Sequence, residues 1–157
     1  MIRDIKKNDC FYEGILYCPM FGKDIKISYE ETVDKSYAEK CAEHLTNLND
    51  DFIDKICKRI SDYHQFMLKE WCDEFVKEIN EKVPVDISGR DILNYVKNPT
   101  LNIFPPKEGI GYSIEGLCEW EPEHGIDIII RDDRLLYVGQ AECLGSWADD
   151  DEYEVMF

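Results

Sequence analysis

The sequence predicts an α+β fold, with an N-terminal β-hairpin, long central helices and a C-terminal antiparallel β-meander packed on the helices. Apolar residues alternate with polar ones near the start of the chain, recur at helical spacing through its middle, and alternate again after residue 111. The 157 residues are 44% hydrophobic, which is enough for one packed core. We therefore expect a single α+β domain over residues 1–157 that ends in an acidic tail at residues 148–157.

The first predicted element is a β-hairpin. Its strands are residues 11–17 and 24–29, in which apolar and polar side chains alternate as in a half-exposed strand. Pro19 and Gly22 interrupt regular structure between the two segments. The hairpin is therefore expected to pair antiparallel.

Helical periodicity follows the hairpin. Either Asp34 or Ser36 suits the N-cap of a first helix. The apolar residues of 52–79 then form one stripe, which predicts a second helix of about 30 residues and about 45 Å. A break at residues 62–65 is the alternative, and Pro84 ends the helix. A stripe of this kind is typical of a face packed on the core.

A short connecting region precedes the meander. Ser88 or Asp91 is expected to cap a short helix over residues 92–96. Residues 101–104 are expected to form a short strand, and the Pro-Pro pair at 105–106 favours an edge strand or a linker there.

The last third of the chain predicts a β-meander. Its expected strands and turns are, in order, residues 112–120, 121–125, 126–131, 132–133 and 134–139. The acidic tail is expected to be solvated, although Tyr153, Val155 and Phe157 would also let it fold back as an edge strand.

Charge is the most informative part of the composition. The net charge is −16, and the last 60 residues hold fourteen acidic but only three basic groups. Binding to nucleic acid or to an anionic membrane depends on Lys and Arg, so neither partner is expected. Such a surface attracts a basic protein instead, although plain solubility is the simpler explanation of the charge.

Cysteine usage and the N-terminus indicate the cytoplasm. The seven cysteines are odd in number and form no C-x-x-C pair, which favours reduced thiols over disulfides or zinc ligands. No apolar run approaches the ~20 residues of a membrane span, and the N-terminus has no apolar signal-peptide core.

Catalytic patterns are lacking from the sequence, which contains no phosphate-binding glycine loop, nucleophile elbow or H-E-x-x-H motif. One constellation combines carboxylates with an imidazole in the 119–127 hairpin. These groups would suit a divalent metal or a general base, but all come from one hairpin, so we expect no metal, no cofactor and no enzyme activity. The structural interpretation is that Gly125 forms the turn, His124 bonds a nearby acceptor and Trp120 anchors the hairpin on the helices.

The hairpin motif W-x-x-E-H-G at residues 120–125 is followed by the strand RLLYVG at 134–139, and the early strand FGKDIKI lies at 21–27. In this order the motifs resemble an uncharacterised family of small acidic bacterial proteins built from a strand pair, helices and a β-meander. Size, charge and layout also resemble immunity proteins of contact-dependent growth inhibition and other polymorphic toxin systems.

The second resemblance implies an inhibitor that neutralises a cognate toxin, either as a monomer or in a 1:1 complex. The toxin would be a basic nuclease, whose phosphate-binding cleft is occluded by acidic side chains. The expected binding residues are the turn and tail acids with two aromatic anchors: Glu119, Glu121, Glu123, Asp127, Asp132, Asp133, Trp147, Asp149, Asp150, Asp151 and Tyr153.

Two other functions remain open. The chain would be an interaction module outside toxin systems if the long helix exposed its apolar stripe to another chain. It would be a small metal-dependent enzyme if the Glu-Pro-Glu-His turn at 121–124 held a metal ion.

Overall fold

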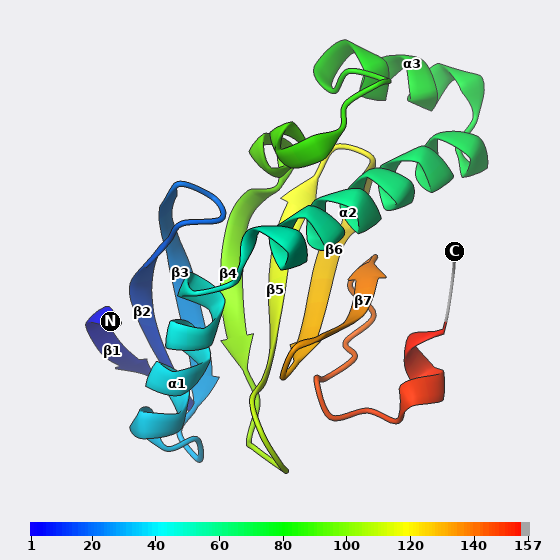
Figure 1. Cartoon of the computed structure of the whole chain (residues 1–157). Helices are drawn as coiled ribbons and strands as arrows, with labels where there is room; N and C mark the ends of the chain where they lie inside the picture. Colours follow the sequence, from blue (N-terminus) through cyan, green and yellow to red (C-terminus); the bar gives the residue numbers. More distant parts are fainter. Residues whose placement is uncertain (155–157) are drawn as a thin grey trace.

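The computed structural model describes residues 1–154 and contains one seven-stranded mixed sheet with helices on one face, which confirms the α+β class (Figure 1). The strands lie side by side in chain order. They are β1 Arg3–Asn8, β2 Phe11–Cys18, β3 Lys23–Glu30, β4 Lys97–Ile103, β5 Gly111–Cys118, β6 Glu121–Arg131 and β7 Arg134–Gly139. Only β3 and β4 pair in parallel, because the helical segment between them carries the chain back across the sheet.

The predicted N-terminal hairpin is confirmed as β2 and β3, and an additional strand, β1, precedes it. The pairing of β1 with β2 is irregular between Arg3 and Lys6, where Asp4 has a φ of 54°. Its six residues RDIKKN are mostly charged, so they carry no apolar alternation that would have predicted a strand.

Strand β4 corrects the prediction of an edge strand or linker, since it lies in the middle of the sheet between β3 and β5. Pro99 is tolerated there because the register with β5 shifts between Lys97 and Thr100, and pairing with β3 starts only at Thr100. The prolines at 105–106 follow the end of the strand and do not disturb its pairing.

Three α-helices follow the hairpin: α1 Lys35–Thr46, α2 Asp50–Glu70 and α3 Asp73–Lys82. Asp34 is the N-cap of α1, and its carboxylate accepts a hydrogen bond from the Ser36 N–H at 2.7 Å. The single 30-residue helix was a wrong prediction, and so was a break at residues 62–65. The chain leaves the helix at Trp71, whose backbone is extended (ψ 153°), and α3 turns back from the end of α2 (Figure 1).

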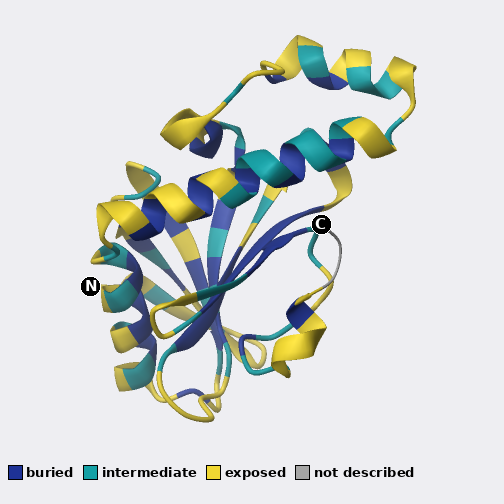
Figure 2. Ribbon diagram, turned by 45° about the vertical axis from the view of Figure 1, so that its right-hand side comes forward, coloured by how far each residue is buried: buried dark blue, intermediate teal, exposed yellow. Residues whose placement is uncertain are grey.

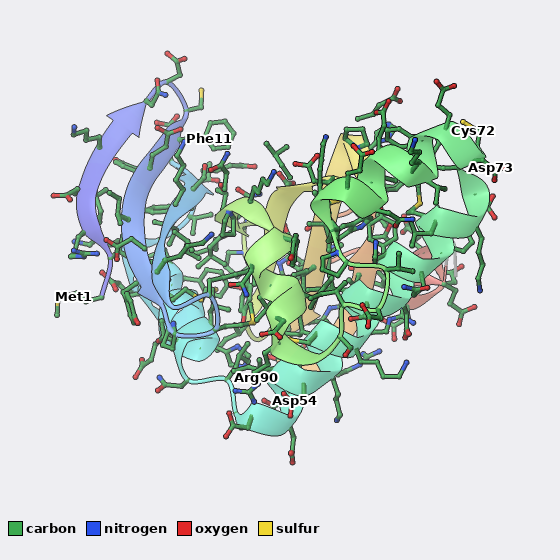
Figure 3. The ribbon with its side chains drawn as sticks, turned by 90° about the horizontal axis from the view of Figure 1, so that it is seen from above. Met1, Phe11, Asp54, Cys72, Asp73 and Arg90 are labelled. Carbon is green, nitrogen blue, oxygen red and sulfur yellow. The ribbon has the colours of Figure 1, made fainter. Side chains whose placement is uncertain are left out.

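The apolar stripe of α2 is buried, as predicted, and forms the main core with the sheet (Figure 2). Its buried members are Phe52, Ile53, Ile56, Cys57, Ile60, Tyr63 and Met67. The predicted short helix is the 3₁₀ helix η1, Gly89–Tyr95, which is tied to α2 where Arg90 donates to Asp54 at 2.7 Å and to Asp50 at 2.8 Å (Figure 3).

The meander strands are confirmed, but the first turn is not where it was predicted. Strand β6 already begins at Glu121, so the turn is formed by Glu119 and Trp120 instead of residues 121–125. The helix-facing side chains of the meander, such as Ile128 and Val138, belong to the main core.

The opposite face of the sheet is only partly covered. Residues 140–154 cross β6 and β7 and end in the 3₁₀ helix η2, Asp150–Tyr153, which buries Tyr153 against Ile129 and Tyr137. The prediction of a solvated tail from residue 148 is therefore wrong up to residue 154, while Val155 and Phe157 lie outside the described residues. None of the helices within residues 1–154 has the length and apolar content needed to cross a bilayer.

Candidate functional site

The β5–β6 hairpin was the first part of the predicted binding surface, and two of its carboxylates are buried. Glu121 is 3% exposed and accepts hydrogen bonds from the backbone N–H groups of Glu123 (3.0 Å) and His124 (3.1 Å). The Nδ1 atom of His124 lies 3.3 Å from the same carboxylate oxygen. Glu121 therefore stabilises the local backbone and is not available to a partner, which corrects its assignment as a binding residue.

Asp127 is the second buried carboxylate, at 1% exposure. Burial raises the pKa of this group to about 7, and the nearby charge of Glu115 acts in the same direction. The Ser113 hydroxyl and the Ile128 N–H partly oppose this increase in pKa. Asp127 is thus a core residue at the meander and no part of an exposed acidic surface.

Glu119 is only partly exposed, and its charge is neutralised within the chain. Its carboxylate forms an ion pair with Lys82 at 2.8 Å and a second one with Lys97. These two hydrogen-bonded ammonium groups lower the pKa of Glu119. The residue therefore joins α3 and β4 to the hairpin, whereas Glu123 remains exposed at the start of β6.

The hairpin motif residues Trp120, His124 and Gly125 occupy structural positions. Trp120 is completely buried, its ring packs on Tyr63 and His64, and its carbonyl accepts a hydrogen bond from the Trp71 indole at 2.8 Å. Gly125 has a φ of 70° and lies inside β6, opposite the irregular pairing near Gly116, whose carbonyl leaves no room for a Cβ atom.

The acids at the other end of the meander are exposed and lie together. We use the name acidic end for Asp132, Asp133, Asp149, Asp151 and Glu152, all of which are exposed. Arg131 and Arg134 flank the β6–β7 turn and donate to the same Asp150 carboxylate, at 3.2 and 2.8 Å. This shared carboxylate joins the β6–β7 turn to η2, the two segments near which the five acids lie.

The five carboxylates of the acidic end have no Lys or Arg partner within residues 1–154. Asp132 accepts a hydrogen bond from the Ile110 N–H at 2.9 Å, which fixes the β6–β7 turn against the β4–β5 loop. Asp133 lies 3.7 Å from Nε2 of His44, whose Nδ1 is 2.9 Å from the Tyr112 hydroxyl. These contacts hold the backbone of the turn and leave the negative charges of the acidic end facing solvent.

The two predicted aromatic anchors serve as supports of this surface. Tyr153 is buried, and its hydroxyl donates to the Gly145 carbonyl at 2.6 Å and accepts from the Ala148 N–H at 3.0 Å. Trp147 is half-buried, with the Arg131 guanidinium 5.6 Å from its ring. Tyr153 is therefore not an exposed anchor, and Trp147 offers only part of its ring to a partner.

Sequence reasoning missed Arg131, which organises this region. Its guanidinium donates to the carbonyls of Ser146 and Ala148, each at 2.8 Å, in addition to Asp150. The signal was present, because Arg131 and Arg134 are two of only three basic residues in the last 60. An isolated cation in an acidic stretch is expected to have internal carboxylate or carbonyl partners.

The residues named for the two alternative functions are arranged differently from what those functions require. Within residues 1–154 no group of three or more His, Cys, Asp or Glu side chains is placed to hold a metal ion. At the 119–127 hairpin Glu121 is turned inward, Glu119 is paired with lysines and Asp127 is buried in the sheet. The apolar stripe of α2, which the interaction module needs on the surface, is packed on the sheet.

Comparison with known families places the chain in one of them. Neither the curated proteins nor the solved structures gave a match. Residues 1–145 match a domain family described as the domain of unknown function DUF6985, so the match covers all seven strands and stops within the segment that leads to η2. The chain belongs to the DUF6985 family.

Proposed function

We propose that the chain is an immunity-type protein that binds a basic toxin, of nuclease type, through the acidic end and so blocks access of nucleic acid to the toxin. The observation that carries this proposal is the group of five exposed carboxylates without Lys or Arg partners, collected at one end of the sheet. Such a surface is complementary to a cleft that binds phosphates, because carboxylates and phosphates offer negative charge to the same Lys and Arg side chains of the cleft.

The charges of the acidic end are preorganised, which favours binding. Asp132 is held by the Ile110 N–H, and η2 is held by Arg131, Arg134 and the Tyr153 hydroxyl. A partner therefore meets an ordered surface and loses less free energy to the ordering of loops. The long-range field of a chain with net charge −16 increases the rate of encounter with a basic protein at low salt.

An inhibitor of this kind would act in the cytoplasm of the producing cell, where a toxin must be neutralised before it reaches nucleic acid. The thiols fit this location. All seven cysteines are free, and burial raises the pKa of Cys41 and Cys57 to about 11, so these thiols stay protonated and unreactive.

The test begins with capture of bound proteins from the source cells on the immobilised chain, followed by elution with salt. A captured basic protein is then expressed in a test host alone or with the chain. We expect growth arrest by the captured protein alone and rescue by the wild-type chain. We expect no rescue by a variant with Asp132→Lys, Asp133→Lys, Asp149→Lys and Asp151→Lys.

A control variant carries the same change of charge elsewhere, with Glu70→Lys, Glu78→Lys, Glu81→Lys and Asp86→Lys on exposed positions of the helical region. It should lose some association rate at low salt but keep rescue, because only the long-range field is altered. Equal rescue by the acidic-end variant and the control would refute the acidic end as the binding surface. A captured protein that does not arrest growth would refute the toxin-inhibitor role itself.

A further inference from the structure

A small cavity lies on the face of the sheet opposite the helices. Its volume is about 120 Å³, and side chains from four neighbouring strands surround it. We call it the β2–β5 cavity. One of its walls is Phe11 at the start of β2, which is 46% exposed and lies on the side of the sheet away from α2 (Figure 3). The residues on which the following argument depends are Phe11, Ser28, Glu30, Asn102, Phe104 and Glu115.

The strand register explains why these side chains converge. Ser28 of β3 lies directly opposite Asn102 of β4, and both have short polar side chains. Phe11 of β2 lies opposite Glu30, which is two residues beyond Ser28 and so on the same face. The other members follow the same alternation from β4 and β5. The short side chains therefore form a hollow that longer glutamate and phenylalanine side chains surround.

The two carboxylates of the cavity are not neutralised by the chain itself. Neither Glu30 nor Glu115 forms an ion pair with a Lys or Arg of residues 1–154. Glu30 accepts a hydrogen bond from the Thr32 hydroxyl at 3.2 Å, which leaves further acceptor positions on its carboxylate. Four larger cavities in the same part of the chain are each lined by at least one Lys, whereas none lines the β2–β5 cavity.

Two phenyl rings add a second feature that favours a cation. Phe11 on β2 and Phe104 just after β4 lie on either side of β3, which carries Glu30. The face of an aromatic ring attracts a cation electrostatically, and the ring also contacts the alkyl chain that bears it. An anion would instead meet two carboxylates, and an uncharged group would leave both of them unpaired. The lining of the β2–β5 cavity therefore favours an organic cation.

We propose that the β2–β5 cavity binds a primary alkylammonium group, as carried by a lysine side chain or by a free diamine. Its oxygen acceptors come from three strands: Ser28 and Glu30 from β3, Asn102 from β4 and Glu115 from β5. They approach from different directions, which suits the three N–H donors of an ammonium group. A planar guanidinium instead suits two parallel bonds to one carboxylate.

The size and position of the cavity limit what enters it. Its volume is well below the roughly 300 Å³ at which small-molecule pockets begin, so only one end of a ligand fits. The cavity lies over β2 to β5, whereas the acidic end is formed by the β6–β7 turn and the segment around η2. The site therefore does not depend on the proposed toxin binding.

Titration of the isotope-labelled chain with Nα-acetyl-lysine methylamide, followed by NMR, tests this proposal. We expect a dissociation constant on the order of 1–10 mM at about 0.15 M salt, because the carboxylates are partly solvated. The largest amide shifts are expected at residues 11, 28–30, 102–104 and 115. Nα-acetyl-norleucine methylamide has the same alkyl chain without the ammonium group and should cause no such shifts. Shifts confined to the β6–β7 turn and η2 would reflect only general attraction to a chain of charge −16 and would overturn the proposal.

Diaminopentane distinguishes the two sources of the ammonium group, because it has the alkyl chain of lysine but no peptide groups. Binding at least about tenfold tighter than that of the lysine derivative identifies a free diamine as the ligand. Equal or weaker binding identifies a lysine side chain of a partner protein. Failure of both probes to shift the cavity amides overturns the proposal and leaves the toxin-inhibitor role untouched.

The variant Glu30→Gln with Glu115→Gln should weaken binding of the lysine derivative by about tenfold or more, because two charged hydrogen-bond acceptors are lost. The matched control, Asp132→Asn with Asp133→Asn, removes the same two charges from the acidic end and should change the dissociation constant by less than about twofold. Glu115→Gln also removes the like charge near Asp127, so stability should not fall, and the Tm checks this. Unchanged binding in the glutamine variant, or an equal loss in both variants, overturns the proposal.

Discussion

At the scale of single residues, two buried ionisable groups make the stability of this protein depend on pH in opposite directions. Asp127 keeps its proton to higher pH in the folded chain than in the unfolded chain, because it is buried in the sheet next to Glu115. His64 is completely buried, neither ring nitrogen has a hydrogen-bond partner within residues 1–154, and burial lowers its pKa. In the folded chain, burial therefore favours the neutral form of both Asp127 and His64 over the charged form.

For Asp127 the folded-state pKa of about 7 lies above the ordinary value of 3.8. The folded chain therefore holds a proton that the unfolded chain releases between these values, so the free energy of unfolding falls as the pH rises through this window. Asp127→Asn removes the charge, and we expect it to raise the free energy of unfolding by about 2–4 kcal/mol near pH 8. Urea unfolding at several pH values measures the difference, which should nearly vanish near pH 4. A difference that does not change with pH would contradict this account.

For His64 the sign is reversed. The unfolded chain takes up a proton near pH 6.5 and the folded chain only at lower pH, so acidification below pH 6.5 lowers the free energy of unfolding. His64→Leu should remove this acid-induced loss while it leaves stability near neutral pH almost unchanged, because the ring makes no hydrogen bond that leucine would lose. Thermal unfolding between about pH 5 and 7.5 tests this. The control is His124→Leu, at an exposed position, and this variant should still lose stability below pH 6.5.

At the scale of elements, the packing partner decides whether a segment is ordered. Helix α2 is stable because its apolar stripe is buried against the sheet, and an Ile60→Ala change there would cost about 2–5 kcal/mol. The four-residue η2 has no such stripe, and it is held by Tyr153, Arg131 and Arg134 instead. The contacts of these three side chains attach η2 to the sheet. The helix lies outside residues 1–145, which match the family.

Tyr153→Ala should therefore release the segment of residues 140–154 without unfolding the sheet. The ring burial and the bonds to Gly145 and Ala148 are lost together, and local opening limits the cost to the docking free energy of the segment. Hydrogen exchange should accelerate at the amides of residues 145–153 and remain slow in β3 to β5. Glu154→Ala, at an exposed neighbour, is the control. Global acceleration of exchange would show that the segment is an integral part of the core.

At the scale of the whole molecule, negative charge is concentrated in the last third of the chain. The acidic end carries exposed carboxylates that have no Lys or Arg partner within residues 1–154. The affinity of the proposed toxin complex should therefore fall as the salt concentration rises. Measurement of this affinity across a salt series tests the prediction, and an affinity that does not change with salt would contradict it.

The candidate surface was predictable only in part. The sequence placed Asp132, Asp133, Asp149 and Asp151 in exposed segments, which the structure bears out. It failed for Glu121, Asp127 and Tyr153, because alternation along a strand assigns a face but does not show which face another segment covers. Residues 140–154 cover the face of β6 and β7 that lies opposite the helices. Their sequence has no apolar periodicity from which this packing could be predicted.

By itself the sequence determined the α+β class, the β2–β3 hairpin, the burial of the α2 stripe and the three meander strands, because each depends on local apolar periodicity. The tertiary structure alone decided the central place of β4, the end of α2 at Trp71 and the docking of η2. Each of these depends on partners distant in the chain: the parallel pairing with β3, the indole bond to Trp120, and the contacts of Arg131. Free energy gained between distant segments outweighs local propensity at these positions, and a single sequence does not reveal which distant segments will meet.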